Sequence, residues 1–322
     1  MIRHAAACTA TATRPAGAVA WLVLVLLGGC AGLGAPPPPL ATAPVELTET
    51  PFHPQEDYLC GPAALATVLN HGGVAVTPEA LIDSLYLPVR RGTLQVELAA
   101  TARRHGRLAV QLDDTLEAVI AQLEQGRPVL VLQNLASSLV PVWHYAVVVG
   151  YLPDADRFVL RSGRERRLLT RRSRFAATWE RAGRWALVLA DPAQVPQRLP
   201  RQNYLRAAAD LENTGRHRQA LTAFRSALGA WPDDPTARLG EANNLYYLGE
   251  HAAAAEAYRA LVADHPGHPV AVHNLAMVLL EQDRPCEARA VIDAAADLDG
   301  DLIATARRAV GAAPRDGCPS AP

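Results

Sequence analysis

Lysine is absent from this chain, because all 31 basic residues among its 322 residues are arginine. We attribute the absence to a bias of the encoding genome, since no single mechanism requires it. The 32 acidic residues nearly balance the arginines and leave a formal charge of -1. A dedicated nucleic-acid binder would normally be strongly basic. The balance therefore argues against nucleic acid as a partner.

Nucleotide-binding loops and metal-ligand clusters are also missing from the sequence. No glycine-rich phosphate loop is present, and the histidines and cysteines do not have the spacing of a metal site. We therefore expect no cofactor and no metal. An apolar content of 50% is nevertheless sufficient for packed cores, and the length suggests two domains.

Residues 1–29 have the features of a signal peptide. Residues 1–45 contain no Asp or Glu, and Arg3 and Arg14 precede an apolar run from Ala16 to Leu27. This run is about half of the roughly 20 residues that span a bilayer, so we expect no permanent transmembrane helix. An ordinary secretory signal that merely contains a cysteine is one interpretation of the segment.

The sequence LLGGC, which ends at Cys30, resembles the lipobox of bacterial lipoproteins. The resemblance implies cleavage before Cys30, lipidation of Cys30 and a membrane contact through the lipid anchor. Because Ala31 rather than Asp follows, it favours the outer membrane, with the protein facing the periplasm. Residues 30–46 are rich in Pro and Ala and predict a stiff tether.

Residues 47–190 alternate between helix-like and strand-like patterns. We expect helices over 60–73, 76–88, 93–106 and 115–126, and strands over 107–112, 128–135, 144–151, 157–163 and 184–192. These elements predict an α+β domain in which a helical half packs on an antiparallel sheet. Three prolines within residues 191–200 mark a linker after it.

Residues 201–302 contain an internal repeat. Gly215, Gly249 and Asp283 lie 34 residues apart, and small residues such as Ala220, Ala254 and Ala288 keep the same offset. This period resembles the tetratricopeptide repeat, an all-α helix-turn-helix unit present here about three times. Such repeats present a concave binding surface, so we expect a peptide, a second protein or the preceding domain as partner. Residues 303–322 are assigned to a C-terminal tail.

Cys60 stands at the start of a predicted helix with the sequence CGPAAL. Pro62 suits the first turn of a helix, and a thiol there faces the positive end of the helix dipole, which favours the thiolate. The side-chain amide of Gln55 could join the Cys60 backbone N–H in donating to a developing oxyanion. Gln55 and Cys60 therefore form half of an acyl-transfer site.

His144 is the favoured general base. His71 and His105 each precede a glycine at a predicted helix end, where contact with terminal carbonyls explains them, and His53 lies in the lead-in segment. His144 instead opens an apolar strand that would hold its ring in one place. A structural role for a buried histidine is the alternative when Cys60 is left aside.

The segment QEDYLCGPAAL, followed about 84 residues later by WHYAVVVGY, resembles the bacteriocin-processing peptidase family. These are papain-like cysteine peptidases that remove double-glycine leaders, and the resemblance covers roughly residues 50–190. It implies a papain-like fold and a peptide or protein substrate. It also implies that Cys60 is the nucleophile, His144 the general base and acid, and Gln55 the oxyanion-hole donor.

The third residue of the site departs from the family pattern. Family members usually place an Asp followed by Pro at the end of the strand after the histidine hairpin, where this sequence has Ser162 and Gly163. Ser162, Glu165 or a backbone carbonyl remain as candidates to orient the imidazole. Losing an orienting Asp can lower turnover greatly without removing the nucleophile.

Two further features stay open at this level. Residues 161–174 contain seven arginines and one Glu, which could attract an acidic substrate or anionic lipid or simply face solvent. Cys286 and Cys318 could pair in an oxidising periplasm. We also expect Trp143, Trp179 and Trp185 in the core.

The sequence thus favours a lipid-anchored periplasmic cysteine peptidase that works through an acyl-enzyme, with repeats that bind a substrate or partner. A catalytically weak or inactive peptidase-fold lipoprotein that serves as an interaction scaffold is the alternative. A transpeptidase that passes the acyl group to an amine is a further one.

Overall fold

The computed structural model describes residues 38–54, 59–87, 89 and 92–314. Gln55, Cys30 and Cys318 lie outside these residues, as do the signal peptide and most of the tether. Within the described ranges, no helix combines the length and apolar character needed to cross a membrane.

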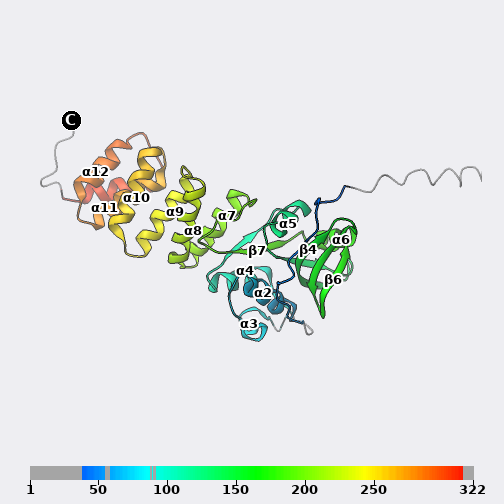
Figure 1. Ribbon diagram of the computed structural model, residues 1–322. Coiled ribbons are helices and arrows are strands. Elements are labelled where there is room, and N and C mark those ends of the chain that lie inside the picture. Colours follow the sequence, from blue (N-terminus) through cyan, green and yellow to red (C-terminus); the bar gives the residue numbers. More distant parts are fainter. Residues whose placement is uncertain (1–37, 55–58, 88, 90–91, 315–322) are drawn as a thin grey trace, which may run out of the picture. The chain divides into compact units, whose positions relative to one another are not determined.

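An antiparallel sheet forms the centre of the first domain (Figure 1). Its seven described strands are β1 Val45–Glu46, β2 Leu108–Gln111, β3 Val129–Asn134, β4 Trp143–Leu152, β5 Arg157–Ser162, β6 Glu165–Arg171 and β7 Ala186–Ala190. The order is β2-β7-β3-β4-β5-β6, and β1 pairs with the end of β4. The long strand β4 therefore has neighbours along its whole length, and His144 is its second residue.

Three helices cover one face of the sheet. These are α2 Cys60–His71, α3 Pro78–Leu85 and α4 Gln95–Arg104. Leu65 and Leu69 of α2 share a buried cluster with Val147 and Val149 of β4. The helix α2 begins at Cys60 and is followed by Gly72 and Gly73, the latter at a φ of 82° that favours glycine.

The opposite face is covered by α5 Leu116–Leu123, α6 Arg172–Glu180 and α7 Arg201–Asn213. Val148 of β4 belongs to the same buried cluster as Trp179 of α6 and Tyr204 of α7. Because successive residues of a strand point to opposite faces, β4 is buried on both sides by its alternate side chains. The α+β architecture expected from the sequence is confirmed.

The helices after the linker reproduce the predicted period. The first helices of the three pairs, α7, α9 Pro235–Tyr247 and α11 Pro269–Glu281, begin 34 residues apart. The second helices, α8 His217–Ala230, α10 His251–Asp264 and α12 Pro285–Ala294, keep the same spacing. Gly215, Gly249 and Asp283 turn the chain between the paired helices with φ values of 74°, 81° and 59°. The helical repeat architecture is thus confirmed.

The first repeat shares its core with the sheet. Tyr204 and Leu205 of α7 belong to the same buried cluster as Leu108 and Val110 of β2. An ion pair between Arg103 and Asp210 joins α4 to α7. The repeats are therefore continuous with the first domain in their packing.

The last helix, α13 Asp301–Ala312, falls mostly within the segment that the sequence assigned to a tail. Ile303, Ala306 and Val310 are buried and join the cluster around Leu275 and Ile292. The helix therefore covers apolar surface that the third repeat would otherwise leave open.

The helix α6 and the strands β1 and β6 were not expected from the sequence. The strand β6 lies at the sheet edge, so its side chains are mostly exposed and carry no apolar alternation. The helix α6 buries Phe175 and Trp179 on a narrow stripe among polar residues. Neither β6 nor α6 has the broad apolar pattern from which helices and strands were predicted.

Close helix packing in the first repeats gives a stability prediction. A Cβ added at Gly240 of α9 would lie 2.4 Å from the ring of Phe224, which is buried and cannot swing away. We expect Gly240→Ala to lower the free energy of unfolding by about 1–3 kcal/mol. Gly229→Ala on α8 meets no atom within 4 Å and should raise it by about 0.5–1 kcal/mol. Urea unfolding followed by circular dichroism measures both, and equal effects would contradict the packing described.

Candidate active site

Cys60 is the first residue of α2, as predicted. Its side chain is partly buried against the cluster of α2, α3 and the sheet. Burial raises the pKa of the Cys60 thiol, while the backbone amides of Tyr145, Gly61 and Cys60 itself act in the opposite direction. Because burial is the larger effect, the neutral thiol is the resting form near neutral pH.

The helix start lies close to the segment before α4. A Cβ at Gly61 would come within 2.4 Å of the Thr93 hydroxyl oxygen. The Tyr145 hydroxyl donates to the Thr93 carbonyl over 3.1 Å and holds this segment against β4. Glycine after the cysteine thus permits the approach that seats Cys60 beside β4.

His144 is held by the neighbouring strand. Its Nε2 lies 2.8 Å from the Ser162 hydroxyl oxygen, at the end of β5. Ser162 is only 8% exposed, so water competes little for this hydrogen bond. When the hydroxyl accepts from Nε2–H, Nδ1 carries the lone pair, and Nδ1 has no hydrogen-bond partner among the described residues.

Burial lowers the pKa of His144 below its ordinary value. The imidazole is therefore neutral near neutral pH and able to accept a proton. Together with the raised pKa of Cys60, this favours a resting pair of thiol and imidazole over a preformed thiolate and imidazolium.

Tyr145 follows His144 in β4 and contacts the Cys60 thiol. Its backbone amide lies at the Cys60 thiol, and its ring belongs to the cluster against which Cys60 packs. His144 is the preceding residue of β4. In the described part of the chain, no hydrogen bond joins the thiol to the imidazole. Such catalytic hydrogen bonds commonly tighten only when substrate binds.

The other two candidate residues are placed differently. Glu165 pairs with Ser162 across the β5–β6 hairpin, but its side chain is exposed and contacts the imidazole nowhere in the described residues. The position of Gln55 cannot be compared, since it lies outside the described residues. Of the predicted site residues, His144 and Ser162 are joined by a hydrogen bond, and Cys60 lies at the backbone amide of Tyr145, the residue after His144.

Arg161 supports this site and was not singled out by sequence. It is 4% exposed and donates to the carbonyls of Thr48 and Thr50 over 3.2 Å and to that of Arg166 over 2.6 Å. It therefore ties the segment that leads toward the active site to the hairpin that carries Ser162. A charged residue inside the otherwise apolar segment FVLRS was the one sequence feature that could have indicated its buried, structural role.

The arginine-rich segment is partly structural. Arg167 pairs with Glu46 over 2.8 Å, and Arg172 pairs with Asp156 over 3.1 Å. With Arg161 buried, three of the seven arginines have an identified role within the domain. The segment therefore cannot be interpreted wholly as a surface for anionic ligands.

An exposed apolar loop adjoins His144. Leu139 is 90% exposed and Trp143 is 55% exposed, and Val140 and Val142 between them are also exposed. The expectation that Trp143 fills the core is wrong, because Trp143 is the first residue of β4 and lies at the exposed end of that strand. Trp179, by contrast, is fully buried. The loop places an apolar surface beside the candidate base.

Two further expectations concern metals and disulfides. No group of His, Cys, Asp or Glu side chains within the described ranges could hold a metal ion. Cys286 is disulfide-bonded and Cys60 is a free thiol. Cys318 lies outside the described residues, so its pairing with Cys286 stays a prediction.

Comparison with known proteins agrees with both domains. Residues 47–187 match the Peptidase C39 like family, and residues 205–243 and 239–303 match the tetratricopeptide repeat. Among solved structures, the chain matches the crystal structure of a candidate C39-like peptidase from Bacillus anthracis. That similarity has 18% identity, a TM-score of 0.40, and coverage of 46% of this chain and 98% of the other. No curated protein matches the chain.

The family matches fall on the elements described above. The first spans helix α2, which begins at Cys60, and strands β2 to β6, which include His144 and Ser162. The second covers most of the helices with the 34-residue period. The chain therefore contains a peptidase C39-like domain followed by tetratricopeptide repeats.

Proposed function

We propose that this protein is a lipid-anchored cysteine peptidase of the bacterial periplasm that cleaves a peptide or protein through an acyl-enzyme on Cys60. The observation that carries the proposal is the fixed imidazole of His144, which Ser162 holds by a hydrogen bond. His144 directly precedes Tyr145, whose backbone amide contacts the Cys60 thiol. The match to a peptidase family supports the same reaction class.

The reaction begins with the neutral pair. Nδ1 of His144 accepts the proton of the Cys60 thiol as sulfur bonds to the carbonyl carbon, and the carbonyl electron pair moves to oxygen. The Cys60 backbone N–H and the Gln55 amide stabilise that oxyanion. Collapse of the intermediate breaks the carbon–nitrogen bond, and the imidazolium returns the proton to the leaving amine.

Water completes the cycle. His144 removes a proton from a water molecule as its oxygen attacks the thioester carbon. The carbon–sulfur bond then breaks, the acid product leaves, and Cys60 recovers its proton from the imidazolium. Ser162 acts throughout as a positioning residue, because it holds Nε2 and leaves Nδ1 to serve as the base.

The electrostatics predict modest turnover. A serine hydroxyl orients the ring but adds no negative charge, whereas a carboxylate would also stabilise the imidazolium. Burial of both reacting groups disfavours their charged forms as well. These observations favour a second candidate function, in which a weak or inactive peptidase fold serves as a scaffold and the repeats bind a protein partner.

The reactivity of Cys60 distinguishes the two candidates. A thiol-directed peptide electrophile at neutral pH should label the mature protein at Cys60, and Cys60→Ala should abolish the label. We expect His144→Ala to slow labelling by about 100-fold, since it removes the base. The label site and rate are measured by mass spectrometry.

His105→Ala provides a matched control, because His105 ends α4 away from the site and is exposed. Its labelling rate should equal that of the wild type. If Cys60 reacts no faster than an ordinary exposed thiol, the peptidase proposal is wrong and the scaffold function remains.

The pH dependence of Cys60 alkylation tests the neutral resting pair. For wild-type protein, the iodoacetamide rate should rise steadily from about pH 5 to pH 10 without an acid-side plateau, because the pKa of Cys60 is raised and that of His144 is lowered. Ser162→Asp places a negative charge at Nε2. It should raise the pKa of His144, stabilise a thiolate beside the imidazolium, and create a plateau below about pH 7.

Ser162→Asn is the neutral control for this experiment and should show no plateau. A plateau already present in wild-type protein would mean that the ion pair forms without a carboxylate, contrary to the effect of burial.

The lipid anchor is tested through Cys30. Wild-type protein should fractionate with membranes and have Cys30 as its mature N-terminus, because cleavage and acylation are coupled to the lipobox. Cys30→Ser should lose both properties, while Cys8→Ser should retain them, since Cys8 would leave with the signal peptide. A mature N-terminus elsewhere than Cys30 would refute the lipoprotein assignment.

A further inference from the structure

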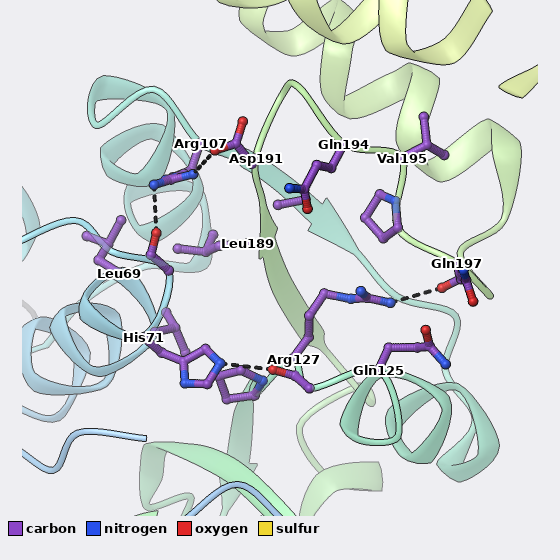
Figure 2. Close-up of a pocket in the computed structure, with 16 residues that line it drawn as sticks. Leu69, His71, Arg107, Gln125, Arg127, Leu189, Asp191, Gln194, Val195 and Gln197 are labelled. Atoms are coloured by element: carbon purple, nitrogen blue, oxygen red, sulfur yellow. Dashed lines mark hydrogen bonds and ion pairs between the residues drawn. The ribbon is translucent and has the colours of Figure 1, made fainter. Parts of the chain in front are cut away.

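A separate pocket lies at the opposite end of α2 from Cys60. Its volume is about 510 Å³, which is within the range of small-ligand sites. The end of α2, the turn between α5 and β3, the end of β7 and residues 194–197 of the linker line it (Figure 2). Because α2 has 12 residues and spans roughly 18 Å, this pocket is distinct from the candidate active site.

Two guanidinium groups face this pocket, but only one has a carboxylate partner. Arg107 Nη1 lies 2.6 Å from the Asp191 carboxylate, and its Nη2 donates to the Gly72 carbonyl over 2.7 Å. Asp191 is the one carboxylate among the residues that line the pocket. Arg127 has no carboxylate partner within the described part of the chain. The pocket therefore carries an uncompensated positive charge.

Arg127 is fixed in place by neutral groups. Its Nε donates to the side-chain oxygen of Gln122 over 2.9 Å, and its Nη2 donates to the Gln197 carbonyl over 3.0 Å. Gln122 is buried, so this anchor is sheltered from water. A guanidinium has five N–H donors, and three of those of Arg127 therefore have no partner among the described residues.

The surroundings of Arg127 suit an anion. Burial lowers the pKa of Arg127, so its charged state is disfavoured by the pocket itself. Gln125 and Gln194 also line the pocket, and their side-chain amides are further potential donors (Figure 2). His71 is already engaged through Nε2 with the Gly126 carbonyl at 2.9 Å, and through Nδ1 with the Thr50 hydroxyl at 3.2 Å.

We propose that this pocket binds a small oxyanion, a carboxylate or phosphate group carried on a compact polar molecule, with Arg127 as its principal contact. Charge-assisted hydrogen bonds from a guanidinium to such groups are strong and directional. Because Gln194 and Gln197 belong to the linker before α7, the bound anion contacts both the first domain and the segment that leads to the repeats. The site is independent of Cys60.

Titration calorimetry with full mature protein tests the site. Inorganic phosphate and citrate are titrated separately at constant ionic strength, with chloride as the balancing anion. We expect saturable binding of at least one probe at one site. Arg127→Gln should weaken it by about tenfold or more, as expected for the loss of a hydrogen bond to a charged group. Binding of phosphate alone indicates a phosphate-bearing ligand, and binding of citrate alone indicates a carboxylate.

A second pair of variants keeps the test valid if Arg127→Gln disturbs the fold. Gln194 is exposed on the pocket wall, and its side chain makes no hydrogen bond within the described residues. A charge of either sign can therefore be introduced there without breaking an existing contact. Gln194→Glu should weaken binding and Gln194→Lys should strengthen it, each by about threefold or more. Arg184→Gln, outside the pocket, should leave the affinity unchanged. Absence of binding by both probes, or equal affinity in wild type and the Arg127 and Gln194 variants, would overturn the proposal.

Discussion

The hydrogen bond between Ser162 and His144 depends on the register of the sheet. Val148 pairs with Leu160 and Val147 with Arg161, which brings the end of β5 beside the middle of β4 and within side-chain reach of His144. A shift of one residue would turn the side chains of one strand to the other face. That shift is opposed by burial on both faces of β4. The packing of the sheet core thus fixes which group contacts the imidazole.

Burial and local polarity act against each other at the candidate nucleophile. The start of α2 supplies amides to the thiol, as a helix N-terminus does, but the cluster beneath it excludes water. The imidazole experiences the same exclusion without a compensating charge, because its partner is a hydroxyl. In the proposed reaction, a proton would therefore move during attack rather than before it. Ser162 orients the ring but adds none of the negative charge that a carboxylate would place beside it.

Features with regular spacing were predictable from the sequence, and features built by tertiary contact were not. The 34-residue period gave the repeat helices, and apolar runs gave β3 and β4. The helix α6 and strand β6 escaped because a sheet edge and a narrow helix stripe leave little apolar pattern. Ser162 could be proposed by its position after the histidine hairpin. The anion pocket could not, since Arg107, Arg127 and the linker meet only after folding.

Because the first repeat and the sheet share a core, deleting the repeats does not test their function alone. Tyr204 and Leu205 of the first repeat helix complete the apolar packing beside β2, so removing the repeats would expose the sheet to water. Loss of activity after such a deletion would then report lost stability as much as lost partner binding. Exposed side chains such as Tyr247 can be changed without opening this core. A role of the repeats in recruiting a substrate or partner must therefore be assigned from surface substitutions that leave α7 intact.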